Sequence, residues 1–527
     1  MPQRRIGQAW LAACTAAAFA FGGLMTPAHA EDSVPTPPPG KTQSWVQEPR
    51  ATMAEQPAFR AQDFTEPGGA ASSGDFTLTA GSNLTSRVER LDAILPKQGV
   101  QNLLLAANRT ARVNCADRDP FLTSEDPAIK YCLMDDDSTS QEWIPQAVTG
   151  VSDAKDNELW GTASDITMFG SYDNWNPGRD SNDNSIGDCN EAELKAHDSC
   201  NEKGVRVTFV QRRADGTVKY RHVLLGWLYE NSADHISYDA LHADEKPLQA
   251  GIHAGGMVWY GNYLYVADTM NGIRVFSMEK IMDLDPDGDP TTHDDMGADT
   301  DGVHTTSNVE DKTKVGRQNN VWYSYGYRYV MPQVASWKFK SPQYNASKYS
   351  SGAPISWCTD YGAPKASYLS LDRSTTPDRL VMGEYCRPGI DLGNPNQIMM
   401  ASTGRISSYP IANLESWSGD VAAQPWANYL PKEGIQGAAA YNGNFYFNQS
   451  SAYSQGSIWQ AELTNGKLTL THEAIKTAVG PEDLYIERGR SRLWSVSEHT
   501  TAESSSCVDQ CQRVLYAHDM NWLQAQP

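Results

Sequence analysis

Three stretches of this chain share one pattern: small residues, an apolar run, a glycine-centred turn and a second apolar run. They are residues 251–269 (GIHAGGMVWYGNYLYVADT), 434–450 (GIQGAAAYNGNFYFNQS) and 480–498 (GPEDLYIERGRSRLWSVSE). A glycine turn between two runs of aromatic and β-branched residues is typical of a β-hairpin. Because such hairpins recur with no helical pattern between them, the sequence predicts a repeated all-β architecture.

Strand-like segments continue from about residue 114 to the C-terminus, in units the size of a propeller blade. Without the polar insertions 172–203 and 283–318, residues 110–527 leave room for about seven blades of about 50 residues each. Six units can be traced, and they begin near Trp143, His253, Val321, Ala366, Gly434 and Glu482. We therefore expect an all-β β-propeller of about six or seven blades. The alternative is a β-sandwich with a second β domain, because single strands do not distinguish the two.

On this blade-like periodicity the chain resembles the broad β-propeller superfamily over most of residues 140–520. The resemblance rests on the repeat of strands and not on a signature, since no WD dipeptide or Asp-box motif is recognisable. The Ala-rich leader and the use of Trp, Tyr and Asp are similar to exported proteins of high-GC Gram-positive bacteria. The resemblance implies a scaffold for binding or catalysis, with ligands in a central channel, but no particular reaction.

The first thirty residues have the features of a signal peptide. Arg4 and Arg5 supply a positively charged start, residues 9–25 are largely apolar, and an Ala-x-Ala cleavage site ends at Ala30. The apolar run is short and is followed by polar sequence, which favours a cleaved signal over a membrane anchor. No later run is long enough to cross a bilayer. We therefore expect a secreted, extracellular protein.

Three further segments follow the signal peptide 1–30. Residues 31–75 are rich in Pro, Gly and Ser and are expected to form a disordered lead, because they cannot bury enough apolar surface to fold. Helical periodicity is confined to residues 84–112, so we expect 76–113 to form a short helical N-terminal cap. The β-propeller domain is expected at 114–527.

The chain is acidic. Its formal net charge is −21, and it becomes −23 when residues 1–30, which hold two arginines and no acidic residue, are removed. Such a charge repels phosphate backbones and anionic lipid surfaces, so we expect neither nucleic acid nor a membrane as a partner. Solubility and cation binding are the simplest explanations of the acidic charge. We also expect the protein to be a monomer.

Eight cysteines remain once Cys14 leaves with the signal peptide. An even number of cysteines in an exported chain predicts disulfides, here four. The spacing favours pairs of sequence neighbours: Cys115–Cys132, Cys189–Cys200, Cys358–Cys386 and Cys507–Cys511. A metal or redox site is the alternative reading, as for any Cys-x-x-x-Cys such as 507–511.

The sharpest local motif is DLDPDGDPTTHDD, which starts at Asp283. Counted from there, alternate carboxylates, a turn glycine and a closing acid fall at the positions of a calcium loop: Asp283, Asp285, Asp287, Gly288, Asp289 and Asp294. Pro290 and the replacement of the closing Glu by Asp depart from the pattern, and no second helix follows. The motif resembles the isolated loops of dockerins and thrombospondin-type repeats. We expect structural Ca²⁺ here; a solvated acidic insertion is the alternative.

The residues that lead into the innermost strands of a propeller face its central channel. Alignment of the hairpin turns places four polar side chains there: Gln146, His253, Gln436 and Glu482. Such a set could hydrogen-bond a sugar, coordinate a cation or simply hold ordered water. Glu482 and His253 could also act as an acid–base pair if burial shifts their pKa values.

Two classes of function are compatible with these observations. The first is an extracellular binding module for a protein or a glycan, favoured by the many Trp and Tyr residues and by the absence of a recognisable nucleophile or zinc motif. The second is an extracellular hydrolase or lyase that acts on a polysaccharide or a phosphoester with central-channel carboxylates. The sequence alone favours the first.

Overall fold

The structure is a computed structural model, and the description below covers the residues listed at the end of this sentence: 65–122, 127–140, 142–173, 203–231, 235–242, 252–285, 314–318, 321–342, 358–386, 402–451, 453–500 and 512–526. Strands dominate this part of the chain, and its helices are short. No helix within it is long and apolar enough to cross a membrane.

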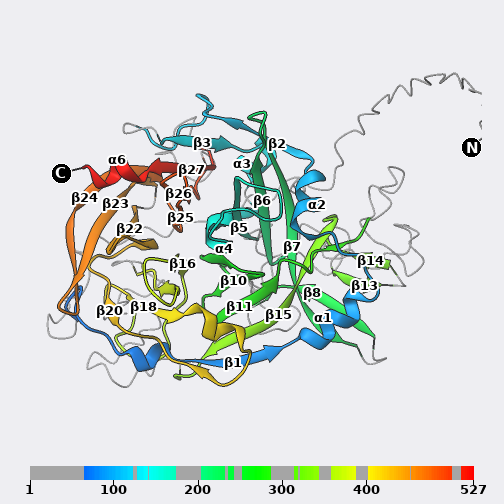
Figure 1. Cartoon of the computed structure of the whole chain (residues 1–527), viewed down its shortest axis with the longest axis horizontal. Coiled ribbons are helices and arrows are strands. Elements are labelled where there is room, and N and C mark those ends of the chain that lie inside the picture. The colour runs from blue at the N-terminus through cyan, green and yellow to red at the C-terminus, as the bar shows by residue number, and fades with distance from the viewer. Residues whose placement is uncertain are drawn as a thin grey trace, which may run out of the picture.

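Five four-stranded antiparallel sheets, here called blades 1 to 5, follow one another around the centre of the molecule (Figure 1). Blade 1 consists of β4 (Trp143–Gly150), β5 (Ile166–Asp173), β6 (Val205–Arg212) and β7 (Val218–Glu230), and blade 2 of β9 (Met257–Tyr260), β10 (Tyr263–Asp268), β11 (Gly272–Ser277) and β15 (Tyr329–Phe339). Blade 3 consists of β16 (Tyr368–Asp372), β17 (Arg379–Gly383), β18 (Arg405–Pro410) and β20 (Ala427–Tyr429), and blade 4 of β21 (Ile435–Tyr441), β22 (Asn444–Ser451), β23 (Ser454–Thr464) and β24 (Lys467–Val479). Blade 5 consists of β25 (Tyr485–Glu487), β26 (Arg492–Val496), β27 (Val514–Asp519) and β3 (Ile129–Cys132).

The innermost strands close into a ring. β4 contacts β9, β9 contacts β16, β16 contacts β21, β21 contacts β25, and β25 contacts β4 again. The last blade is completed from the other end of the domain, because β3 pairs antiparallel with β27, with Tyr131 opposite Leu515. This closure leaves few free sheet edges, which is the way a propeller avoids edge-to-edge association. The chain therefore has a β-propeller fold.

Short strands tie the outer edges of neighbouring blades together. β15 runs parallel to β7 of blade 1, β2 (Arg109–Val113) pairs with both β3 and β7, and β1 (Leu78–Asn83) pairs with β15 and with β19 (Asp420–Val421). The remaining elements are β8 (Ile236–Ala240), β12 (Met282–Asp283), β13 (Gly316–Gln318), β14 (Val321–Tyr323), η4 (Ser73–Phe76), α1 (Thr85–Asp92), α2 (Gly99–Leu105), α3 (Asp135–Ser138), α4 (Val151–Ala154), η9 (Ile411–Glu415) and α6 (Met520–Gln524). The helices α1 and α2 fall in the segment whose periodicity predicted helix.

The described strands form five blades, so the expected count of six or seven is not confirmed. The difference comes from the segments that begin near His253 and Val321, which the sequence pattern treats as two units. In the structure β15 is the outermost strand of blade 2, with Trp337 opposite Ile273 of β11. A strand that joins its sheet only after a long insertion leaves no local signal of where it pairs.

A hairpin turn illustrates how directly the sequence specifies the blades. Tyr441 pairs with Asn444, and the two residues between them, Asn442 and Gly443, have φ angles of 52° and 83°. Positive φ at both central residues defines a type I′ turn, whose twist matches that of the flanking strands, and Asn-Gly is its preferred dipeptide.

Glycines at the start of the inner strands allow the blades to approach closely. A Cβ atom on Gly255 would lie 1.9 Å from the main-chain oxygen of Ser367, and one on Gly437 would lie 2.8 Å from the Cα atom of Asp483. Neither main chain could move without disturbing its own blade. The small residues that precede the apolar runs in the sequence are therefore required by the packing of one inner strand against the next.

The hydrophobic core lies between the blades. Blades 1 and 2 share a cluster that includes Met168 and Trp259, and blades 3 and 4 share one that includes Val381 and Phe447. Similar clusters join the other neighbours, and the largest fully buried side chains include five tryptophans: Trp143, Trp259, Trp322, Trp337 and Trp494. Because each blade needs its neighbours to cover its faces, the ring is stable only as a whole.

Two of the expected disulfides lie in the described part of the chain, and both are formed: Cys115–Cys132 and Cys358–Cys386. Each closes a short loop, with 17 and 28 residues of sequence separation. The expected pairs Cys189–Cys200 and Cys507–Cys511 lie outside the described residues.

Candidate ligand site at the centre of the ring

Two inner strands carry a β-bulge at the same place, and each bulge holds a glutamine. In β4 the register shifts between Pro145 and Ala147, so that Gln146 is the extra residue. In β21 it shifts between Ile435 and Gly437, so that Gln436 is the extra residue. A bulge turns the side chain of its extra residue away from the regular alternation of the sheet.

The start of the inner strand of blade 5 has a related irregularity. Pro481 pairs with Ser497, and the regular ladder resumes only at Tyr485, opposite Trp494. The three residues 482–484 therefore face two residues, 495–496. This irregularity lies at the start of the inner strand, the position at which the bulges of Gln146 and Gln436 occur in blades 1 and 4. Its first residue is Glu482.

These side chains form one hydrogen-bonded cluster around the axis of the ring. The Nε2 atom of Gln436 donates to Oε1 of Glu482 over 3.0 Å, and Nε2 of Gln146 donates to Oε1 of Glu498 over 3.1 Å. Glu482 and Glu498 are themselves hydrogen-bonded to each other. Three blades thus contribute to a chain that runs from Gln436 through the two carboxyl groups to Gln146.

The two glutamates of this cluster differ in environment. Glu482 is 1% exposed, and its burial, the negative charge of Glu498 and the hydrogen bond between them raise the pKa of Glu482 well above its usual range. The side chain of Glu498 is 20% exposed, and its Oε2 atom lies 3.5 Å from Nε2 of His499. Burial and the nearby carboxyl group of Glu498 therefore both disfavour the ionised form of Glu482.

Two aromatic stacks flank the carboxyl pair. The rings of Tyr172 and His253 are stacked with their centroids 4.5 Å apart, and those of Tyr453 and His499 lie at the same separation with a tilt of 36°. His253 is exposed to solvent, yet the surrounding protein desolvates it and lowers its pKa, against an opposing effect of Glu498.

Asp483 lies beside the cluster and joins three blades. Its Oδ2 atom accepts hydrogen bonds from the main-chain N–H groups of Val148 and Met257, each over 3.3 Å, and its own N–H group donates to the main-chain oxygen of Gln146. Asp483 is fully buried, and burial raises its pKa well above the usual range even though these N–H groups oppose the shift. Its role is to fasten the inner strands where they meet.

The structure brings the predicted channel residues together, but it changes one pairing. Gln146, Gln436 and Glu482 belong to the cluster, whereas the expected acid–base partners Glu482 and His253 have no direct contact; both interact with Glu498 instead. Glu498 was missed by the sequence reasoning, although a signal was available. It closes the predicted hairpin 480–498, so that the turn brings it back next to the residues that lead into β25.

The calcium loop is described only at its beginning. The carboxylate of Asp283 accepts two hydrogen bonds from Arg328, over 2.7 and 2.9 Å, and a third from Gln98 over 2.8 Å. This donor set does not fit a calcium ligand, because the two oxygens of Asp283 already hold an arginine. Asp285 donates its main-chain N–H to Asp283. The other predicted ligands lie outside the described residues: Asp287, Asp289 and Asp294.

No cluster of three or more His, Cys, Asp or Glu side chains placed to hold a metal ion occurs in the described ranges.

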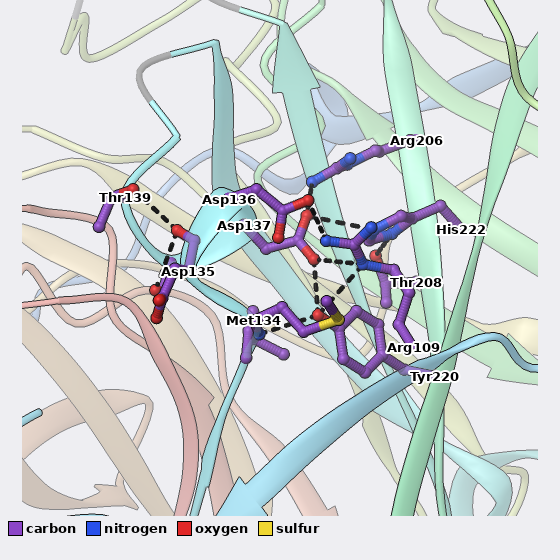
Figure 2. A network of polar contacts seen from close by, with 12 residues as sticks. Arg109, Met134, Asp135, Asp136, Asp137, Thr139, Arg206, Thr208, Tyr220 and His222 are labelled. Atoms are coloured by element: carbon purple, nitrogen blue, oxygen red, sulfur yellow. Dashed lines mark hydrogen bonds and ion pairs between the residues drawn. The ribbon is translucent and has the colours of Figure 1, made fainter. Parts of the chain in front are cut away.

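A second polar cluster is fully buried between β3 and blade 1 (Figure 2). The carboxylate of Asp137 accepts hydrogen bonds from Arg109 (2.9 Å), Arg206 (2.8 Å) and the hydroxyl group of Tyr220 (2.7 Å), and lies 3.2 Å from Nε2 of His222. The side chain of Asp137 is 1% exposed. Each direction around it is occupied by a protein donor, so this cluster joins blades 5 and 1 and is not a ligand site.

Comparisons with known proteins show no family and find only distant structural neighbours. No model of a known protein family matches the sequence, and no curated protein matches it either. Among solved structures, the chain is similar to Pseudomonas fluorescens PhoX in complex with vanadate, at 8% identity and a TM-score of 0.33, over 81% of this chain and 99% of that one. It is also similar to CoXyl43, a GH43 β-xylosidase/α-arabinofuranosidase from a compost microbial metagenome, at 9% identity and a TM-score of 0.27, over 72% and 92%. A third is the Dos1 propeller, at 10% identity and a TM-score of 0.23, over 67% and 68%. At these values the likeness does not extend to a site or an activity, and the propeller fold rests on the pairing of the strands.

Proposed function

We propose that this protein is a binding module whose ligand site lies at the centre of the ring and takes a hydroxyl-rich ligand of the kind a glycan presents. The observation that carries the proposal is the hydrogen-bonded chain from Gln436 through Glu482 and Glu498 to Gln146, with an aromatic stack on either side. Amide and carboxyl groups next to aromatic rings are the usual means by which proteins bind sugars, because sugars present hydroxyl groups at their edges and C–H groups on their faces.

Binding of polysaccharides and oligosaccharides to the purified protein tests the proposal. We expect the Glu498→Ala and Gln146→Ala variants to lose binding while the melting temperature stays close to that of the wild type. Gln101→Ala is the matched control, because Gln101 is exposed on α2 and its side chain donates only to Thr162 at the surface. A panel of neutral, acidic and amino glycans that gives no binding, or binding that survives both site substitutions, would contradict the proposal.

A hydrolase or lyase is the second candidate, favoured by the raised pKa of Glu482, a shift in the direction that a general acid requires. Against it stands the spacing of the acids. A glycosidase needs about 5–10 Å between its two carboxyl groups to hold the sugar or a water between them, whereas Glu482 and Glu498 are hydrogen-bonded to each other. Release of p-nitrophenol from p-nitrophenyl glycosides or from bis-p-nitrophenyl phosphate, abolished in Glu498→Gln, would make the enzyme the better description.

Calcium binding by the rest of the predicted loop, Asp285, Asp287, Asp289 and Asp294, belongs to the same proposal. Because Asp283 holds Arg328, its removal would destabilise the protein with or without calcium, and it is therefore a poor test. The informative variant is Asp287→Ala/Asp289→Ala. Added Ca²⁺ should raise the melting temperature of EDTA-treated wild type, but not of this variant, through ligand linkage. An equal rise in both would place calcium elsewhere.

Export and a monomeric state complete the proposal. The cleavage site at Ala30 and the disulfides Cys115–Cys132 and Cys358–Cys386 support an extracellular protein, since disulfides persist in oxidising compartments. The partner is then an extracellular glycan or a glycan-bearing protein. Mass spectrometry of the culture medium and sedimentation analysis test these points: a mature chain that begins at Glu31 and sediments as a monomer is the expected result.

A further inference from the structure

The central site carries one negative charge within reach of solvent. Glu498 is the more exposed of the two glutamates, and the hydrogen bond from Glu482 requires a proton that only one of them can hold. Since burial disfavours the charged form, the buried Glu482 is the one that favours its neutral form, and the more exposed carboxyl group of Glu498 is the one that a ligand can reach. Oε1 of Glu498 accepts a hydrogen bond from Nε2 of Gln146, which orients the carboxyl group, and Oε2 of Glu498 lies 3.5 Å from Nε2 of His499.

No lysine or arginine of the described residues forms an ion pair with Glu482, Asp483 or Glu498. Arg513 is near, but it directs its guanidinium to main-chain oxygens, those of Ser140, Trp143 and Glu498. Among the described residues these three acids have no ion pair with a lysine or arginine, and Glu498 lies 3.5 Å from His499, which is charged only when it is protonated. An anionic ligand such as a phosphate or a uronate would be repelled by these acids and would find no cation to pair with its own negative charge.

From these observations we propose that the ligand carries a protonated amine beside its hydroxyl groups, as an amino sugar does, and that the amine donates to Glu498. This inference rests on the proposed glycan-binding function and adds the charge of the ligand to it. A charge-assisted hydrogen bond to a partly desolvated carboxylate is about twice as strong as a neutral one. The acidic balance of the whole chain raises the local concentration of cationic ligands in addition.

The test compares two tetrasaccharides that share a β-1,4-linked glucose backbone and differ at one position of each sugar. The β-1,4-linked tetramer of glucosamine carries amines there, and cellotetraose carries hydroxyl groups. Titration calorimetry at about pH 6.5, where amines are largely protonated and carboxylates are ionised, should give at least about tenfold tighter binding for the amine. The preference should shrink as the ionic strength rises from about 0.05 M to about 0.5 M.

Two substitutions by glutamine distinguish the roles of the two glutamates. Glu498→Gln removes the charge and keeps the shape, so that it should lower the affinity for the glucosamine tetramer about tenfold more than the affinity for cellotetraose and thereby abolish the preference for the amine. Glu482→Gln is the matched control, because it replaces a carboxyl group that is already neutral, and the preference should persist. A preference that survives in Glu498→Gln but disappears in Glu482→Gln would overturn the assignment of the charge.

The remaining outcomes separate this inference from the proposed function. Equal binding of the two tetramers overturns the inference and leaves the proposed function in place. Binding of the amine alone supports both. Failure of both tetramers overturns the inference, and the proposed function is then decided by the full glycan panel: binding of any neutral glycan that Glu498→Ala abolishes would still support it.

Discussion

The buried carboxylate of Asp137 offers the sharpest test of how the propeller is held together. Replacement by asparagine keeps the shape of the side chain but removes the charge that faces the guanidinium groups of Arg109 and Arg206 and the ring of His222. Arg206 then loses its counter-charge, Arg109 keeps that of Asp136, and one of the donors that faced the carboxylate of Asp137 faces an amide N–H₂ group instead. Breaking a buried ion pair from one side costs about 3–5 kcal/mol. We expect Asp137→Asn to lower the free energy of unfolding by that amount.

A neighbouring residue supplies the control. Asp135 lies on the same short helix, α3, and pairs with Arg118, but its side chain is 91% exposed. Its partner Arg118 is buried, but solvent screens the carboxylate of Asp135, so Asp135→Asn should cost less stability than Asp137→Asn. Urea unfolding followed by tryptophan fluorescence measures both variants. If the two substitutions cost the same within about 1 kcal/mol, the argument from burial is refuted.

The partners of Asp137 also determine how the stability difference between the wild type and Asp137→Asn depends on pH. Burial by itself would raise the pKa of Asp137, but His222 and Arg206, and then Arg109, outweigh it and hold the pKa well below its usual range. A group with a depressed folded-state pKa contributes stability above its unfolded-state pKa of about 3.9 and loses it only as the pH falls through the lower folded-state value. The difference between wild type and Asp137→Asn should therefore not shrink between about pH 7 and about pH 4.5.

Two further predictions concern the centre of the ring. The raised pKa of Glu482 means that the protein prefers its neutral form; its contribution is present below the unfolded-state pKa and is lost as the pH rises through the folded-state value. Glu482→Gln should therefore be more stable than wild type in alkaline buffer and equal to it at about pH 4; thermal unfolding at several pH values measures this, and a constant difference would count against it. Gly437→Ala should cost about 1–3 kcal/mol, because its Cβ atom would meet Asp483. Gly74→Ala is the control, since the nearest atom to its Cβ would lie at 3.7 Å; equal unfolding midpoints in urea would be the contrary result.

The blades were predictable where their signals are local. The type I′ turn at Asn442-Gly443 and the apolar runs on either side of it identify β21 and β22 from the sequence alone. The glutamines at 146 and 436 could be placed in the central channel for the same reason, because the alignment of hairpin turns fixes which residues lead into an inner strand. The bulges that direct these side chains were not visible, since a bulge is defined by pairing with a partner strand.

The number of blades could not be obtained in this way. β15 joins β11 only after the long insertion that follows β12, and β3 joins β27 from the opposite end of the domain. Each pairing depends on which blade has an unpaired edge strand, and that depends on how all the other blades are arranged.

The sequence by itself determined the kind of element, the turns and the residues that enter the centre of the ring, because a period of two and a glycine turn act over a few residues. Only the tertiary structure decided the partners of the charged groups. Glu482 meets Glu498, Asp283 meets Arg328, and Asp137 meets Arg206, in each case a residue that the local pattern does not single out. The physical reason is that the state of a carboxyl group depends on its burial and on nearby charges, and both are fixed only when distant strands have packed together.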